Sequence, residues 1–206
     1  MINKKGNIIV LSSASGTGKT TISNSILKID KQIVRSVSLT TREIRSKEKQ
    51  GLDYFFVSKD IFVHEIKNNT LLEYASIFSN YYGTKKEYIY HILNKGIDVF
   101  CCIDFQGLLQ IQKNVDGYNI ISIFLLPPTM NELKTRLCNR NSESSDNQQL
   151  RIINAKKEFK NSIYYDYVLI NDELHSTIQN VHTIIKIHRN NMKNYDLNAY
   201  IDFLIK

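Results

Sequence analysis

Short apolar runs alternate with longer amphipathic stretches along this chain. The first run, from Ile8 to Leu11, has the length and composition of a buried strand. A polar stretch follows it, and then Ile22, Ile26 and Leu27 recur at the spacing of one helix face. Because strands and helices continue to alternate, the pattern predicts a parallel sheet flanked by helices and joined by right-handed crossovers.

The same reading places the remaining elements. Further strands are expected at 33–39, 53–57, 71–77, 98–104, 119–126 and 166–171. Further helices are expected at 59–68, 85–93, 107–115, 129–140, from about 148 onward, and at 173–188. Thr129 is a predicted N-cap with Glu132 as its capping-box partner.

One segment interrupts the alternation. Residues 38–93 are rich in strand-forming sequence, and the stretch from Tyr81 to Thr84 is expected near the strand at 71–77 and its following loop. We interpret this segment as a lobe inserted into the parallel framework and facing the loop after the first strand. No internal repeat is present.

Composition narrows the class of protein. Of 206 residues, 42% are hydrophobic, and no stretch approaches the roughly 20 apolar residues of a membrane span. The amino-terminal apolar run is too short for a signal-peptide core, and three cysteines without a framework fit a reducing compartment. We therefore expect a cytoplasmic protein with no membrane partner.

The net charge is +7, from 27 basic and 20 acidic residues. Such an excess suggests anionic partners, either nucleic acid or phosphorylated small molecules, although it equally serves solubility. The loop described next favours small molecules, so we expect no nucleic-acid partner.

Residues 12–21 (SSASGTGKTT) lie between the first strand and the first helix and nearly match the phosphate-binding P-loop pattern. Gly16 and Gly18 allow backbone N–H groups to converge on phosphate oxygens, and the helix start adds its positive dipole. Lys19 would reach the β and γ phosphates, and the Thr20 hydroxyl would bind Mg²⁺. Ser13 replaces the first glycine, which is tolerable if its dihedral angles stay in the ordinary allowed regions.

Other charged residues are weaker candidates. Arg42 and Arg45 lie in a polar loop that is either simply solvated or suited to bidentate phosphate recognition. Asp104 ends a buried strand, as a Walker-B-like acid or a ligand contact does, and period-two alternation places Cys102 on the same strand face.

Arg136 and Arg140 share one helix face, for which a solvated basic surface is the commoner explanation. The five histidines show no metal-ligand spacing with cysteines or acids, and we interpret them as surface or packing residues.

Taken in order, several motifs resemble the guanylate kinase family over nearly the whole chain. They are residues 15–20 (SGTGKT), 38–42 (SLTTR), 51–54 (GLDY), 73–75 (EYA), 80–84 (NYYGT), 103–107 (IDFQG), 127–128 (PP) and 170–172 (IND). The resemblance implies a P-loop nucleoside monophosphate kinase fold with an α/β parallel-sheet core at 1–37, 94–128 and 160–206. It also implies a GMP-binding lobe at 38–93 and a helical lid at 129–159.

The resemblance further implies the roles of individual residues. The expected ATP-binding residues are Ser13, Ala14, Ser15, Gly16, Thr17, Gly18, Lys19, Thr20, Thr21 and Asn171, with Thr20 also the Mg²⁺ ligand. The expected GMP-binding residues are Arg42, Arg45, Tyr54 and Tyr82 at the phosphate, and Ser38, Glu73, Thr84 and Asp104 around the guanine. The expected catalytic residues are Lys19, Arg42, Arg136, Arg140 and Arg151.

Three departures from the family pattern stand out. Ser13 replaces a glycine. Ile44, Ser46 and Lys47 replace a proline-containing pattern around Arg45, so that loop is expected to be more flexible. Cys102 stands where the family usually has an acid, which leaves the local Mg²⁺ or acceptor network in question but not the fold.

The expected activity is therefore Mg²⁺-dependent transfer of the γ-phosphoryl group of ATP to GMP, and also to dGMP, in purine nucleotide metabolism. One alternative is a non-catalytic module of the same fold that binds phosphopeptides through Arg42, Arg45, Tyr54 and Tyr82. A second alternative is a kinase for a different monophosphate, because a P-loop alone does not select the acceptor. The sequence leaves the oligomeric state open.

Overall fold

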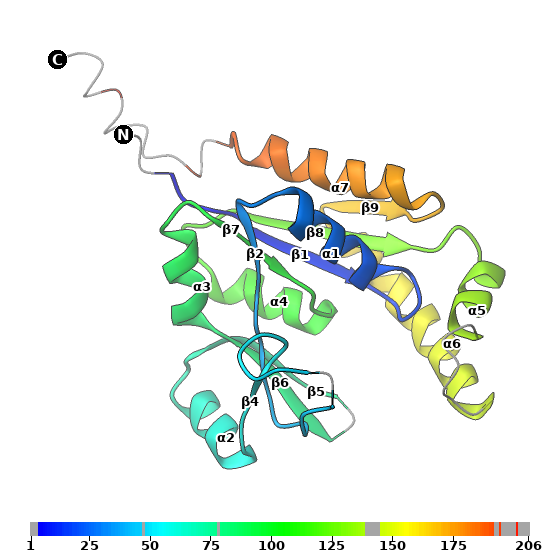
Figure 1. Ribbon diagram of the computed structural model, residues 1–206, viewed down its shortest axis with the longest axis horizontal. Helices are drawn as coiled ribbons and strands as arrows, with labels where there is room; N and C mark the ends of the chain where they lie inside the picture. The colour runs from blue at the N-terminus through cyan, green and yellow to red at the C-terminus, as the bar shows by residue number, and fades with distance from the viewer. Residues whose placement is uncertain are drawn as a thin grey trace.

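The computed structural model describes residues 4–46, 48–77, 79–138, 145–191, 194 and 201. Its centre is a five-stranded sheet in which every pairing is parallel, in the order β2-β7-β1-β8-β9 (Figure 1). The strands are β1 (Ile8–Ser13), β2 (Ile33–Arg35), β7 (Asp98–Cys101), β8 (Ile120–Leu126) and β9 (Tyr167–Ile170). The predicted α/β fold is confirmed.

Helices cover both faces of this sheet (Figure 1). On one face Ile9 and Leu11 of β1 pack with residues of α1 (Lys19–Ile29) and α7 (Leu174–His188). On the other face Ile8 and Val10 pack with residues of α3 (Lys86–Leu93) and α4 (Phe105–Asn114). A strand exposes successive side chains to opposite faces, so β1 is apolar throughout because both of its faces are buried.

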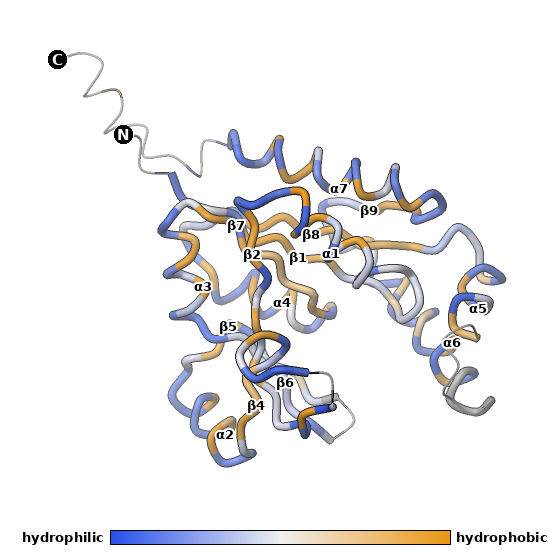
Figure 2. Tube along the Cα trace, in the orientation of Figure 1, coloured by the Kyte–Doolittle hydropathy of each residue, from blue (hydrophilic) through white to orange (hydrophobic). Residues whose placement is uncertain are grey.

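The hydropathy of the backbone trace follows this arrangement. In Figure 2 the central strands β1, β7 and β8 are mainly apolar, whereas the outer turns of α3 and α7 carry polar residues. All six residues of β1 are buried, and the buried positions of α7 (Thr177, Val181 and Ile185) recur every four residues. The amphipathic period that predicted α7 is thus the period of its contact with the sheet.

A second sheet forms the inserted lobe, in the order β4-β3-β6-β5. Its strands are β3 (Leu39–Thr40), β4 (Phe55–Phe56), β5 (Leu71–Ile77) and β6 (Asn80–Lys85), and α2 (Lys59–Lys67) packs on it. Its small core centres on Leu39, Phe62 and Leu71. Gln110 on α4 exchanges two hydrogen bonds with the backbone of Tyr74 on β5, which joins the lobe to the core.

The structure corrects or refines the predictions for four segments of the two sheets. The strand expected at 33–39 is two strands, β2 in the core sheet and β3 in the lobe sheet, because the chain leaves one sheet for the other. Residues 81–84, expected near the strand at 71–77 and its following loop, belong to a strand of their own, β6, which pairs with both β3 and β5. The strand expected at 53–57 is reduced to β4, and Tyr54 forms only an isolated bridge with Gln50. The strand expected at 98–104 is shorter, because β7 ends at Cys101, before Cys102 and Asp104.

Two helices, α5 (Met130–Cys138) and α6 (Ser145–Lys160), lie at the other end of the core sheet from the lobe (Figure 1). The Oγ1 of Thr129 accepts from the backbone N–H of Glu132 at 3.1 Å, which confirms the predicted cap. The Glu132 carboxylate bonds to Arg136 instead of completing the capping box. Helix α6 begins three residues before the expected start, and a 3₁₀ turn, η1 (Asn161–Tyr164), follows it.

None of the helices built from described residues has the length and apolar character required to cross a bilayer.

Candidate active site

The loop between β1 and α1 has the backbone geometry that its glycines suggest. Gly16 and Gly18 adopt positive φ angles of 89° and 99°, a region that side chains with a Cβ rarely enter. Ser13 is the last residue of β1 and has no positive φ. A serine therefore fits where the P-loop pattern has a glycine, because this position requires no left-handed backbone.

Asn171, directly after β9, holds this loop from the opposite side. Its Nδ2 donates to the Thr17 carbonyl at 2.7 Å, and the residue is only 4% exposed. Its Oδ1 is buried and has no hydrogen-bond partner among the described residues. Asn171 thus restrains the loop and offers an unused acceptor beside it.

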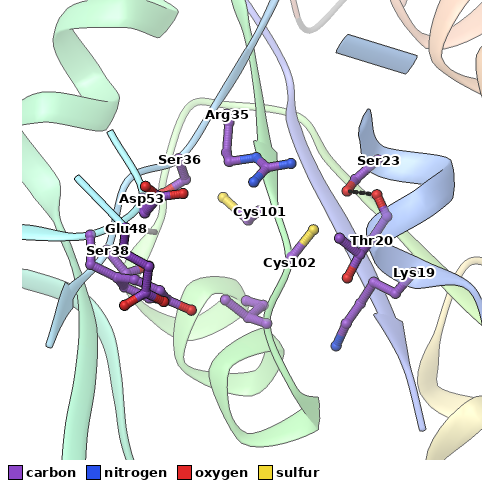
Figure 3. Close-up of a pocket in the computed structure, with 12 residues that line it drawn as sticks. Lys19, Thr20, Ser23, Arg35, Ser36, Ser38, Glu48, Asp53, Cys101 and Cys102 are labelled. Carbon is purple, nitrogen blue, oxygen red and sulfur yellow. Dashed lines mark hydrogen bonds between the residues drawn. The ribbon is translucent and has the colours of Figure 1, made fainter. Parts of the chain in front are cut away.

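Two cavities meet at the start of α1. One, of about 350 Å³, extends toward the lobe and is lined by Ser38, Glu48, Tyr54 and Cys102 among others (Figure 3). The other, of about 530 Å³, lies between the loop and α6. Its lining residues are Ser13, Ala14, Ser15, Gly16, Gly18, Asp104, Asn154, Lys157 and Glu158, together with Lys19 and Thr20. Lys19 and Thr20 line both cavities, so these two side chains connect them.

Four residues assigned to the base by the resemblance lie close together in the lobe and at its junction with the core. The Thr84 hydroxyl donates to Glu73 Oε1 at 2.6 Å and lies 3.4 Å from the Ser38 hydroxyl. Burial raises the pKa of Glu73 to about 7, against the Thr84 hydrogen bond, and the negative charge of Asp104 raises it further. Glu73 is 5% exposed, and its carboxyl can accept from a ligand donor when it is ionised.

The residues assigned to the acceptor phosphate form an aromatic and cationic group. The Tyr54 and Tyr82 rings lie 5.9 Å apart, and the Arg42 guanidinium lies 5.5 Å from the Tyr54 ring. Arg42 also forms a salt bridge of 2.7 Å with Glu48, which raises the pKa of Arg42. Arg45 is exposed at the rim, and its backbone N–H donates to the same carboxylate at 3.0 Å.

The arginines expected in the lid occupy different positions. Arg136 donates from Nη1 to the Asn171 carbonyl at 3.2 Å and from Nε to Glu132 at 2.8 Å. Arg151 on α6 donates to the Ser15 hydroxyl at 3.2 Å. Both arginines therefore lie on the side of the loop where ATP is expected to bind. Arg140 lies outside the described residues.

Asp104 and Cys102 are located differently from the prediction. Because β7 ends at Cys101, the strand alternation that grouped them does not apply. Asp104 is instead the N-cap of α4, accepting from the Gly107 N–H at 2.9 Å. Cys102 is exposed and does line the cavity beside Lys19 and Thr20, although loop geometry and not a strand face puts it there.

The donor set near Thr20 suits a hydrated Mg²⁺ ion. No group of three or more histidine, cysteine or acidic residues within the described part of the chain could hold a metal. Mg²⁺ in phosphoryl-transfer sites usually needs few protein ligands, because waters and substrate phosphates complete its shell. The Thr20 hydroxyl therefore fits the role of a direct ligand, and Asp104 lines the same cavity beside the loop.

Glu48, Lys157 and Glu158 are among the cavity residues that the sequence did not predict. Glu48 follows Arg42 in the same polar loop, and this opposite charge six residues away was the available signal. Lys157 and Glu158 line the cavity beside α6, where burial raises the pKa of Glu158 while the Lys19 charge lowers it. No sequence pattern indicated that Lys157 and Glu158 line a cavity. Helix α6 is polar on most sides, so only packing determines which of its faces points inward.

A strand, a glycine-containing loop with a lysine and a threonine, and a helix start, placed between two cavities, define a P-loop phosphotransferase. The inserted lobe carries the buried carboxylate of Glu73, and its Arg42 lies beside Tyr54, which lines the cavity toward the lobe; this arrangement defines the subclass that phosphorylates nucleoside monophosphates.

Comparisons with known proteins identify the family. The sequence profile of the family described as guanylate kinase matches residues 5–188. A guanylate kinase of Rickettsia felis is 44% identical over 188 residues, covering 91% of this chain and 97% of the relative. A guanylate kinase of Wolbachia pipientis is 40% identical, covering 91% of this chain and 93% of the relative.

A solved structure agrees with these relatives. The crystal structure of guanylate kinase from Anaplasma phagocytophilum superposes with a TM-score of 0.76 at 31% sequence identity, covering 95% of this chain and 93% of that one. The chain belongs to the guanylate kinase family, the ATP:GMP phosphotransferases.

Proposed function

We propose that this chain transfers the γ-phosphoryl group of ATP to GMP in the presence of Mg²⁺, giving ADP and GDP, in cytoplasmic purine nucleotide metabolism. The observation that carries the proposal is the position of Lys19 and Thr20 in both cavities. A cation and a hydroxyl shared by a donor and an acceptor site are suitably placed where a phosphoryl group crosses between them.

On the donor side, the loop from Ser13 to Thr21 would hold the ATP phosphates with its backbone N–H groups and the α1 dipole. Arg136 and Arg151 would approach the phosphates from α5 and α6, and the same role is proposed for Arg140. The unused Oδ1 of Asn171 supports a contact with adenine, since the adenine amino group is a donor.

On the acceptor side, guanine presents N1–H and an amino group as donors and O6 as an acceptor. The Glu73 carboxylate would accept from the two donors, while the Ser38 or Thr84 hydroxyl would donate to O6. Asp104, whose charge acts on Glu73, would complete the base site. Arg42, Arg45, Tyr54 and Tyr82 would hold the GMP phosphate.

No general base is required, because the attacking oxygen of GMP is already anionic. The protein residues contribute by aligning the two nucleotides and by placing positive charge where negative charge redistributes. Bound Mg²⁺, held by Thr20 and the ATP phosphates, would neutralise part of the phosphate charge.

The division into core, lobe (38–93) and lid (129–159) explains how water is excluded. Water is the competing acceptor, so closure of lobe and lid around both nucleotides would protect the transfer. The buried face of α3 belongs to the core cluster, and Leu72 of β5 joins the same cluster. The lobe sheet with α2 is therefore proposed to move about its junction with the core at β5.

A coupled assay of ADP formation with ATP, Mg²⁺ and each of GMP, dGMP, AMP and UMP tests the proposal. GMP is expected to be the preferred acceptor, and Lys19→Ala is expected to lose nearly all turnover while remaining folded, because the lysine charge matters most in the transition state. A phosphopeptide-binding module would show no turnover with any acceptor. Preference for AMP or UMP would instead identify a kinase for another monophosphate.

A further inference from the structure

Glu48 is one of two acidic residues, with Asp53, that line the cavity extending toward the lobe, where Lys19 and Arg35 supply positive charge (Figure 3). Its two carboxylate oxygens accept from Nη2 of Arg42 at 2.7 and 3.0 Å. One of them, Oε2, also accepts from the backbone N–H of Arg45 at 3.0 Å. The side chains of Arg42 and Glu48 are only 15% and 19% exposed, so this contact is sheltered from solvent.

The other contacts of Arg42 fix the plane of its guanidinium. Nη1 donates to the backbone carbonyl of Glu43 at 2.7 Å, and the group lies 5.5 and 5.6 Å from the ring centroids of Tyr54 and Phe56. An arginine held in this way has already lost rotamer freedom that it would otherwise lose on binding a phosphate.

The loop that carries the two arginines has no proline to restrain it, since Ile44 and Ser46 occupy its centre. Glu48 supplies a restraint instead. Besides the carboxylate contact with the Arg45 N–H, the Glu48 backbone N–H donates to the Arg45 carbonyl at 3.0 Å. Glu48 therefore ties the Arg42 side chain to the backbone at Arg45.

We propose that Glu48 is a positioning residue, which holds Arg42 and the Arg45 backbone in the arrangement that receives the acceptor phosphate. In the opposite role, Glu48 would compete with the acceptor phosphate for the Arg42 guanidinium, and the phosphate would have to displace it. The contact with the Arg45 backbone favours positioning, because a competitor for the guanidinium has no need of it. This inference rests on the GMP kinase function proposed above.

Steady-state kinetics of Glu48→Ala and Glu48→Gln test the role, with KM determined separately for GMP and for ATP. Glu48→Ala is expected to raise KM for GMP about tenfold or more, because the charge-assisted contacts that orient Arg42 are lost. Glu48→Gln keeps an acceptor oxygen and is expected to fall between Glu48→Ala and the wild type. KM for ATP should not change. Glu43→Gln is the matched control, since it removes the same charge from an exposed side chain next to Arg42.

Guanosine binding, measured by calorimetry, separates positioning from general damage to the lobe. Guanosine lacks the phosphate, so Glu48→Ala is expected to bind it as the wild type does. An unchanged or lowered KM for GMP would overturn the positioning role, and so would an equal loss of guanosine binding. If the wild-type protein showed no turnover with GMP, the proposed function itself would fail, which is a different result.

Discussion

Burial of one carboxyl group, that of Glu73, links base recognition to pH. Its pKa is raised to about 7, chiefly because burial disfavours the charged form. Guanine offers hydrogen-bond donors, which require the ionised form. In the empty protein the same burial costs folding stability as the pH rises from the ordinary glutamate pKa toward 7.

Guanosine affinity is therefore expected to fall as the pH drops below 7, by about tenfold per pH unit, because binding must first remove the Glu73 proton. Calorimetry with guanosine avoids the titration of the phosphate group itself. Glu73→Gln should bind guanosine more weakly, show no such pH dependence, and have a narrower ratio of GMP to AMP turnover. A pH profile that is the same in both proteins would contradict this role of Glu73.

Cys102 lines the cavity that extends toward the lobe, as Thr20 does. In the guanylate kinase family an acid usually stands at this position. Cys102→Ser is expected to be nearly silent, because phosphoryl transfer needs no thiolate. Cys102→Asp should retain GMP kinase activity but change its Mg²⁺ dependence, since a carboxylate there offers an acceptor to the hydrated ion. Rates measured against Mg²⁺ concentration test both variants. A folded but inactive Cys102→Ser protein would mean that the thiol has a chemical role.

At the scale of elements, the P-loop depends on a contact with the segment after β9. A Cβ added to Gly18 would lie 2.4 Å from Nδ2 of Asn171, the atom that bonds to the Thr17 carbonyl. Helix α5 restrains the same loop, because Leu133 and Leu137 pack against Gly16. The loop is therefore held by two elements that are distant from it in sequence.

Gly18→Ala is expected to lower the unfolding free energy by about 1–3 kcal/mol through backbone strain and also to abolish most turnover, because Asn171 must move. Gly117→Ala is the matched control. Gly117 has a positive φ of 76°, but the nearest atom to an added Cβ is Lys5 Nζ at 3.7 Å. Gly117→Ala should therefore lose stability without losing activity. Normal turnover by Gly18→Ala would show that the Asn171 contact is dispensable.

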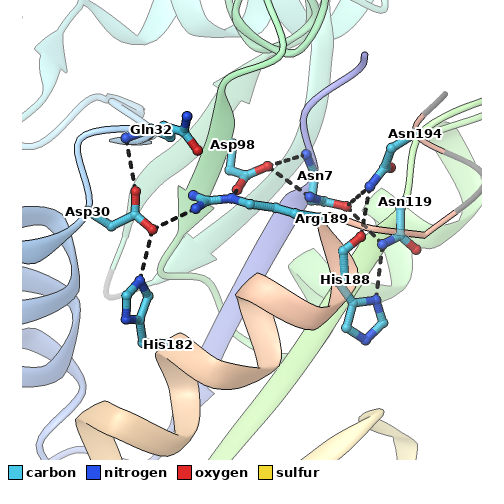
Figure 4. A network of polar contacts seen from close by, with 9 residues as sticks. All are labelled: Asn7, Asp30, Gln32, Asp98, Asn119, His182, His188, Arg189 and Asn194. Carbon is cyan, nitrogen blue, oxygen red and sulfur yellow. Dashed lines mark hydrogen bonds and ion pairs between the residues drawn. The ribbon is translucent and has the colours of Figure 1, made fainter. Parts of the chain in front are cut away.

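At the scale of the whole molecule, a buried polar network ties α1, β7 and α7 together (Figure 4). It lies at the end of the core sheet where β1 and β7 begin, whereas the P-loop follows the other end of β1. Arg189, directly after α7, donates to Asp98 at 2.6 Å and to Asp30 at 2.8 Å. Asp98 also accepts from the backbone N–H of Asn7 at 2.7 Å, and Asp30 lies 2.9 Å from His182. Burial alone would raise the pKa of Asp30, but hydrogen bonds from Arg189, Gln32 and His182 lower it overall.

Arg189→Met is expected to reduce the unfolding free energy by roughly 3–5 kcal/mol at neutral pH, because two buried carboxylates lose their cation. Since the folded-state pKa of Asp30 is lowered, its contribution is present above the ordinary aspartate pKa and is lost as the pH falls through the folded value. The difference from wild type should therefore shrink in acid. Urea unfolding at several pH values measures it, with the exposed Lys186→Met as control. A difference that does not vary with pH would point to lost packing alone.

The local patterns of the sequence were sufficient for the core. The apolar run of β1, the two glycines followed by Lys19, and the helical spacing after them predicted a strand, a phosphate-binding loop and a helix, and the structure confirms this order. These features depend on backbone sterics and on burial of nearby residues, which neighbouring side chains already encode.

The tertiary structure decided which sheet each lobe segment joins and which side chains meet. Residues 33–39 read as one strand, yet Leu39 belongs to a different sheet from Ile33, because strand partners are chosen by contacts distant in sequence. Cys102 reaches the cavity from a loop and not from a strand face. The pairing of Glu48 with Arg42 and the meeting of Glu73 with Thr84 likewise follow from the folding of the lobe. Propensity and periodicity are properties of neighbours along the chain, whereas pairing, burial and the resulting pKa values depend on the neighbours that folding provides.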